Sequence, residues 1–107
     1  MPRLIVSIDG VVVKEVQLTK DRSTIGRRPY NDIVIDNLAV SGEHAVLHLA
    51  GGQATLEDLG SKNGTQLNGE RISGRVRLAD QDEILLGKAP LIFRVSSGAL
   101  STATSLD

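Results

Sequence analysis

The sequence of 107 residues contains no cysteine and no tryptophan, and only one phenylalanine and one tyrosine. The lack of cysteine excludes a disulfide framework and any thiolate metal site. Because aromatic side chains are so scarce, the core must consist of valine, isoleucine and leucine, which favours β-strands. There is no apolar run of about 18 residues and no charged segment followed by an apolar leader, so we expect no membrane span and a cytoplasmic protein.

The charges are nearly balanced, since 12 Lys and Arg against 13 Asp and Glu give a formal net charge of −1. A dedicated nucleic-acid-binding domain usually carries a strong basic excess, so we do not expect nucleic acid as a partner. Any anion site would have to be local, built from a few residues. The length is that of one domain with a small core.

Short aliphatic segments separated by turn residues run along most of the sequence, and no segment has a convincing helical period. Asp9-Gly10 and Gly51-Gly52 each stand between two such segments, which is typical of β-hairpins. The sequence therefore predicts an all-β fold over residues 1–95, an antiparallel β-sandwich of about ten to eleven short strands. Residues 96–107 are small and polar, and predict a flexible C-terminal tail.

Three polar blocks stand out between the strand-like segments: Ile25–Ile33, Val40–Ala45 and Asp58–Thr65. The third, Asp-Leu-Gly-Ser-Lys-Asn-Gly-Thr, follows an alternating run and predicts a tight surface loop. Together the blocks supply an arginine, a serine, a lysine and an asparagine. These side chains suit the binding of a phosphate group and of the peptide that carries it.

In this order, the blocks resemble the forkhead-associated (FHA) domain family. The resemblance spans roughly residues 3 to 95 and rests on Gly26-Arg27, Asn31-Asp32-Ile33, Ser41-Gly-Glu-His44, Asp58–Thr65 and Leu67-Asn-Gly69. It implies a β-sandwich with its ligand loops at one end. It also implies a phosphothreonine-binding module that acts downstream of a Ser/Thr kinase and is neither an enzyme nor dependent on a cofactor.

The resemblance places five residues at the ligand. Arg27 would bind the phosphate through its planar guanidinium, and Ser41 through its hydroxyl. Gly42 stands where many relatives carry a polar side chain, so it would offer only its backbone N–H. Lys62 would either face the phosphate as a mobile charge or lie in solvent. Asn63 would clamp the peptide backbone, because its amide both donates and accepts.

Five further residues are assigned to the support of the site. Gly26 and Gly64 would permit the loop conformations, with Thr65 as part of the same architecture. Asn68 would hold a neighbouring loop by bonds from its side chain to the backbone. His44 would join two loops by hydrogen bonds, as it does in the family.

Two kinds of chemistry compete with this interpretation of His44. Ser41, His44 and Asp58 could form a catalytic triad. A serine and a histidine three residues apart in a turn do not imply attack geometry, so we prefer a structural histidine. His48 lies four residues after His44 and suggests a metal pair, but no third ligand accompanies it and no metal site is predicted.

The remaining expectations concern the surroundings of the site. Arg28 could reinforce the positive field at the phosphate or simply be exposed, and exposure is the preferred interpretation. Asn31 and Asp32 are expected to be turn formers that do not touch the ligand. The alternative function is phospho-independent association with a partner or with a second copy. A narrower hypothesis is weak self-association through the tail, in which phosphorylated Thr104 docks on a second copy; a random polar tail is the preferred interpretation.

Overall fold

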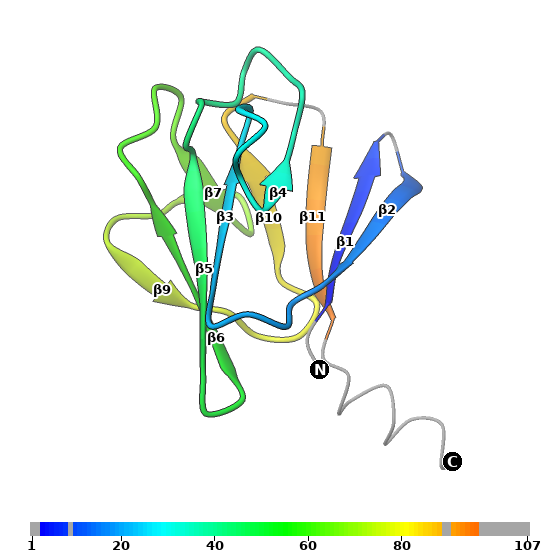
Figure 1. Ribbon diagram of the computed structural model, residues 1–107, viewed down its shortest axis with the longest axis vertical. Helices are drawn as coiled ribbons and strands as arrows, with labels where there is room; N and C mark the ends of the chain where they lie inside the picture. The colour runs from blue at the N-terminus through cyan, green and yellow to red at the C-terminus, as the bar shows by residue number, and fades with distance from the viewer. Residues whose placement is uncertain (1–2, 9, 89–90, 97–107) are drawn as a thin grey trace.

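The computed structural model describes residues 3–8, 10–88 and 91–96, and these residues form a β-sandwich without a helix (Figure 1). The strands are β1 (Arg3–Ile8), β2 (Val11–Gln17), β3 (Arg22–Gly26), β4 (Ile33–Val34), β5 (Ala45–Ala50), β6 (Gln53–Asp58), β7 (Thr65–Leu67), β8 (Glu70–Arg71), β9 (Arg75–Arg77), β10 (Glu83–Leu86) and β11 (Leu91–Ser96). The predicted all-β sandwich of ten to eleven short strands is therefore confirmed.

The strands form two sheets, ordered β2-β1-β11-β10-β7-β8 and β4-β3-β5-β6-β9. Among the described strands, β3 and β4 depart from the predicted antiparallel arrangement, because they pair in parallel with Ile25 opposite Ile33. The chain leaves β3 into a loop and returns to begin β4 beside Ile25. The N–H of Ile35 then donates to the carbonyl of Gly26 at 2.9 Å, which fixes the returning segment against the end of β3.

The hairpin of β5 and β6 sets the position of the polar loops. Gly51 and Gly52 have φ values of +60° and +78°, the left-handed conformation that a two-residue hairpin turn requires. The register that follows from this turn places Ala45, the first residue of β5, opposite Asp58, the last residue of β6. The loops before β5 and after β6 consequently leave the sandwich at the same end.

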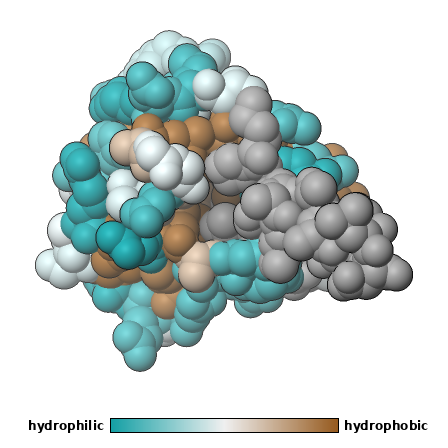
Figure 2. Space-filling view, turned by 90° about the horizontal axis from the view of Figure 1, so that it is seen from below, coloured by the Kyte–Doolittle hydropathy of each residue, from teal (hydrophilic) through white to brown (hydrophobic). Residues whose placement is uncertain are grey.

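The core between the sheets is aliphatic, as the composition predicts. Its largest fully buried aliphatic side chains are Leu4, Val6, Leu18, Ile25, Ile33, Val40, Leu47, Leu56, Ile84 and Leu86. Figure 2 views the sandwich from the end opposite the polar loops and shows apolar residues in the middle of this face, with hydrophilic residues above, below and to the left of them. Truncation of such a leucine to alanine typically costs about 2–5 kcal/mol.

One strand and one strand boundary differ from what the sequence predicts. Strand β8 has no counterpart among the predicted segments, since both of its residues are exposed and leave no alternation to detect. Strand β11 ends at Ser96, one residue beyond the predicted boundary, and the rest of the predicted tail, 97–107, lies outside the described residues together with Thr104. The described part of the chain contains no helix with the length and apolar character needed to cross a membrane.

Candidate functional site

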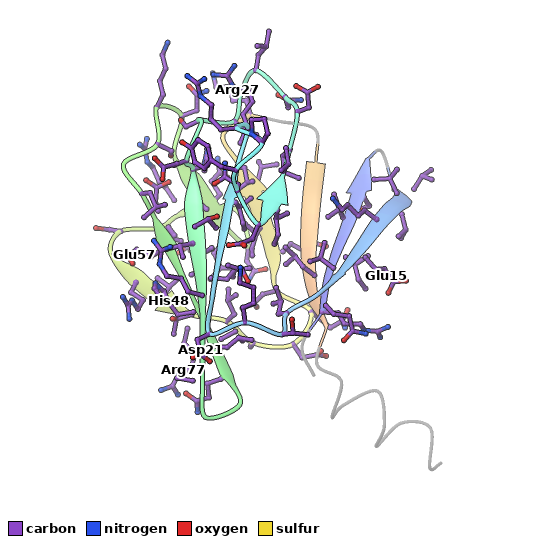
Figure 3. The ribbon with its side chains drawn as sticks, viewed as in Figure 1. Glu15, Asp21, Arg27, His48, Glu57 and Arg77 are labelled. Atoms are coloured by element: carbon purple, nitrogen blue, oxygen red, sulfur yellow. The ribbon has the colours of Figure 1, made fainter. Side chains whose placement is uncertain are left out.

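Three loops meet at one end of the sandwich, at the top of Figure 1: residues 27–32 between β3 and β4, 35–44 between β4 and β5, and 59–64 between β6 and β7. Ile25 pairs with Ala45, and Ala45 with Asp58, so the three strands end side by side. Figure 3 shows Arg27 at this end. The structure thus brings together the three polar blocks that the sequence singles out.

The first two loops are joined through their backbones. The N–H of Arg27 donates to the carbonyl of Ser41 at 3.0 Å, and the N–H of Arg28 to the carbonyl of Gly42 at 3.3 Å. A Cβ on Gly26 would lie 2.2 Å from the carbonyl oxygen of Gly42. Only glycine therefore allows β3 to end this close to the second loop.

Asn31 strengthens the same junction, and its role was missed by the sequence analysis. Its side chain is buried, and its Nδ2 donates to the carbonyl of Arg28 at 2.8 Å and to that of Gly42 at 2.7 Å. Its Oδ1 is buried without a hydrogen-bond partner among the described residues. An asparagine in a polar turn carries no sign of burial, so no signal in this single sequence could have distinguished this bridge from a turn former.

Arg27 and Ser41 are held so that part of each side chain stays free to bind. The Nε of Arg27 donates to the carbonyl of Val40 at 3.2 Å, which leaves its two terminal amino groups without a partner in the described part of the chain. The Oγ of Ser41 accepts a hydrogen bond from the N–H of Lys62 at 3.0 Å. The hydroxyl proton finds no acceptor among the described residues, so this serine can donate to an anion.

His44 links the second and third loops and is completely buried. Its Nδ1 accepts from the N–H of Ser41 at 3.0 Å, so Nε2 carries the proton and donates to the carbonyl of Gly64 at 2.8 Å. Both ring nitrogens are engaged by backbone groups, and neither bonds the Ser41 hydroxyl. This geometry matches the predicted structural histidine and gives no support to a catalytic triad.

Asp58 organises the third loop. One carboxylate oxygen accepts from the N–H groups of Gly60 and Ser61 at 3.0 and 2.9 Å, and the other accepts from the hydroxyls of Ser61 and Thr65, both at 2.6 Å. Burial alone would raise the pKa of Asp58, but these hydrogen bonds and the nearby His44 ring outweigh it and lower the pKa below its usual value. The sequence gives Asp58 only as part of the motif, not as the centre of the loop.

Asn63 and Lys62 project from this loop into solvent. The Nδ2 of Asn63 donates to the carbonyl of Ala39 at 3.0 Å, which uses one of its two protons and leaves Oδ1 without a partner among residues 3–8, 10–88 and 91–96. Gly87 packs behind Asn63, since a Cβ on this glycine would lie 2.9 Å from the Asn63 Cβ and 2.6 Å from the Ala39 carbonyl oxygen. The amide thus retains both a donor and an acceptor for a ligand.

This set of residues recurs in known proteins. The family model of the FHA domain matches residues 23–87, which contain all three loops. The chain belongs to the FHA domain family.

Individual relatives agree with this assignment. The chain is 41% identical over 76 residues to the glycogen accumulation regulator GarA of Mycolicibacterium smegmatis, a match that covers 71% of this chain and 48% of GarA. Among solved structures, the FHA domain of CT664 from Chlamydia trachomatis has a TM-score of 0.80 at 26% identity, covering 89% of this chain and 95% of that one. Mycobacterium tuberculosis EmbR in complex with a low affinity phosphopeptide also has a TM-score of 0.80, at 32% identity, covering 90% of this chain and 24% of EmbR. The chain spans about half the length of the curated relatives it matches.

Two of the predicted support residues of this FHA domain lie in different places. Thr65 is buried at the site, where its hydroxyl donates to Asp58. Asn68 lies at the far end of β7, where its Nδ2 donates to Asp82 and its Oδ1 accepts from the N–H of Glu83, each at 2.9 Å. Asn68 does hold a neighbouring loop, as predicted. This loop precedes β10 and is not one of the three loops that form the candidate site.

The two histidines do not form a common metal site. The ring of His48 lies 3.2 Å from the Glu57 carboxylate on the five-stranded sheet, and Figure 3 shows this pair away from Arg27. Hydrogen bonding from His48, followed by the charge of Arg75, lowers the pKa of Glu57. No group of three or more metal-ligating side chains occurs among the described residues.

Proposed function

We propose that this FHA domain binds phosphothreonine in an extended segment of a partner protein and so acts downstream of a Ser/Thr kinase. The main support for the proposal is that hydrogen bonds with three other residues hold Ser41 in place. Arg27 donates to its carbonyl, His44 accepts from its N–H, and Lys62 donates to its hydroxyl oxygen. The Ser41 hydroxyl proton has no acceptor among the described residues and is left for a ligand, and two of the residues whose backbone N–H groups hold Ser41, Arg27 and Lys62, carry positive charge.

In this proposal the phosphate is held from three sides. The terminal amino groups of Arg27 form a planar fork that matches two phosphate oxygens. Ser41 donates its hydroxyl proton to the phosphate, and the N–H of Gly42 is a further backbone donor on the same loop. Lys62 lies next to Asn63 with an exposed ammonium group, which adds charge without a fixed geometry.

The peptide backbone beside the phosphothreonine is assigned to Asn63. Its free Oδ1 can accept from a peptide N–H, and its remaining Nδ2 proton can reach a peptide carbonyl. Charge-assisted hydrogen bonds are worth roughly 1.5–3 kcal/mol each. A few of them, after ordering costs, reach about −8 kcal/mol, which corresponds to a micromolar Kd.

EmbR, of which 24% has the same fold, is known in complex with a low affinity phosphopeptide, and GarA is a regulator by name. Both descriptions support a binding module over an enzyme. The engaged ring of His44 supports the same conclusion, because it has no nitrogen left to act as a base. A cytoplasmic location and a kinase substrate as partner complete the proposal.

The test is fluorescence anisotropy with a labelled peptide selected from a degenerate phosphothreonine library, alongside its unphosphorylated and phosphoserine forms. We expect saturable micromolar binding of the phosphothreonine form, weaker binding of phosphoserine, and none without phosphate. Arg27→Ala should abolish binding. Arg77→Ala is the matched control, because Arg77 is exposed toward the opposite end of the five-stranded sheet (Figure 3).

Equal binding of the phosphorylated and unphosphorylated peptides would refute the proposal and favour the phospho-independent alternative. The surface to examine would then be β2, where Val11, Val12 and Val13 are 55–64% exposed. Loss of binding in Arg77→Ala as large as that in Arg27→Ala would also contradict the assignment of the site.

A further inference from the structure

Arg28 occupies the space that a side chain at position 42 would fill. An ideal Cβ on Gly42 would lie 3.0 Å from the Cγ of Arg28 and 3.2 Å from its Nε. Gly42 directly follows Ser41, and its φ lies outside the left-handed range. Other residues could adopt the backbone conformation of Gly42. The absence of a side chain at this position leaves the space that Arg28 fills.

The two arginines lie on either side of Ser41. The Nε of Arg27 is anchored on the carbonyl of Val40, the residue before Ser41. The side chain of Arg28 passes over Gly42, the residue after it. The backbone hydrogen bonds from Arg27 to Ser41 and from Arg28 to Gly42 hold the loop after β3 against the loop before β5.

The guanidinium of Arg28 is also uncommitted. It is exposed, and it makes no ion pair or hydrogen bond of its side chain in the described part of the chain. By contrast, Arg3, Lys20 and Arg75 lie within ion-pair distance of Glu15, Asp32 and Glu57. A cation beside Ser41 that no carboxylate neutralises is suited to an anionic ligand.

From this geometry we infer that Arg28 is a second phosphate-binding arginine, which takes the place of the side chain that Gly42 lacks. The inference rests on the proposed phosphothreonine function and assigns a further residue to the same site. The phosphate donors then come from both sides of Ser41: Arg27 from the side of residue 40 and Arg28 from the side of residue 42. This role of Arg28 also explains why residue 42 is a glycine, since a larger residue there would push Arg28 away from the ligand.

The experiment measures the Kd of the labelled phosphothreonine peptide for wild type, Arg28→Gln, Gly42→Ala and the double variant, with Arg77→Gln as control. Arg28→Gln should weaken binding about tenfold, the effect of losing one charge-assisted hydrogen bond at an exposed site. Gly42→Ala should weaken binding in the wild-type background and have no further effect in Arg28→Gln. Such non-additivity is expected when two positions act through one side chain.

A salt titration separates charge from structure. Raising the salt concentration should weaken the wild type more than Arg28→Gln, because screening removes an attraction that the variant has already lost. Arg77→Gln should keep the wild-type Kd and salt dependence. Binding by Arg28→Gln within twofold of wild type, or an equal effect of Gly42→Ala in both backgrounds, would overturn the inference.

Different experimental results would contradict the proposed function and the role of Arg28. If wild type binds only the phosphorylated peptide and Arg27→Ala abolishes binding while Arg28→Gln does not weaken it, the function stands and the inference is wrong. If wild type does not distinguish the phosphorylated from the unphosphorylated peptide, both are wrong.

Discussion

We expect replacement of Asp58 by alanine to lower the free energy of unfolding by about 4 kcal/mol, because its carboxylate accepts four hydrogen bonds worth about 1 kcal/mol each. Two donors are backbone N–H groups of Gly60 and Ser61, and two are the hydroxyls of Ser61 and Thr65. Alanine leaves all four donors without this partner. The measurement is urea denaturation, with a lower midpoint and an unchanged slope.

Asparagine at the same position is the matched variant. Its Oδ1 can accept from the two backbone N–H groups, and its Nδ2 can donate to the two hydroxyl oxygens of Ser61 and Thr65. The two backbone N–H groups keep an acceptor without its charge, whereas the hydroxyl protons of Ser61 and Thr65 lose theirs, so we expect a cost of about 2 kcal/mol, half that of alanine.

The pH dependence tests the role of the charge. The pKa of Asp58 is lowered in the folded protein, so its ionised form stabilises the fold at pH values above the ordinary pKa of 3.8. This contribution disappears as the pH falls through the lowered native value. The stability gap between wild type and Asp58→Asn should therefore be constant near neutral pH and shrink below pH 3.8. A cost of alanine below about 1 kcal/mol, or an equal cost for alanine and asparagine, would refute the reasoning.

Two further predictions concern the loop between β3 and β4. Gly26→Ala should cost about 3 kcal/mol or more by urea denaturation, because the new Cβ would lie 2.2 Å from a Gly42 backbone atom that cannot easily move; a cost below about 1 kcal/mol would show that the loops can separate. Asp32→Asn should reduce stability at neutral pH, and its difference from wild type should become much smaller as the pH falls to 2. Hydrogen bonding from Lys20, followed by that from the N–H of Thr24, lowers the pKa of Asp32 to about 2, so its contribution is lost as the pH falls from 3.8 through that value. A difference in stability between Asp32→Asn and wild type that is as large at pH 2 as at neutral pH would contradict this assignment.

The strands and hairpins could be predicted because their signals are local. Gly51-Gly52 marks a two-residue turn wherever it separates two apolar alternations, and the register of β5 and β6 follows from it. The pairing of β3 with β4 could not be predicted, since Ile33–Val34 is only two residues long and its direction depends on the path of the loop before it. Strand β8 was missed for a similar reason, because it has no apolar side chain to bury.

The sequence predicts that the three polar loops form one site, but it indicates only part of the contacts among them. The motif places Arg27, Ser41 and Asn63 at one end of the sandwich, and the three loops do meet there. The bridge made by Asn31 and the position of Arg28 over Gly42 depend on which carbonyls and Cα atoms the loops bring together. Such contacts follow from the tertiary path of the chain, and no local pattern encodes them.

The hydrogen bonds at Ser41 reduce the number of ligand contacts that binding requires, because they order the loops in advance. Its carbonyl, N–H and hydroxyl oxygen are each fixed by a different residue, namely Arg27, His44 and Lys62. The bonds from Arg27 and Lys62 join the first and third loops to the second, and the bond to His44 holds the second loop internally, so binding need not order the loop backbones. The remaining cost is the side-chain freedom of exposed groups such as Arg27 and Lys62, about 0.5–1.5 kcal/mol each. Under the proposed function, a site held in this way can therefore reach micromolar affinity with a handful of hydrogen bonds to the ligand.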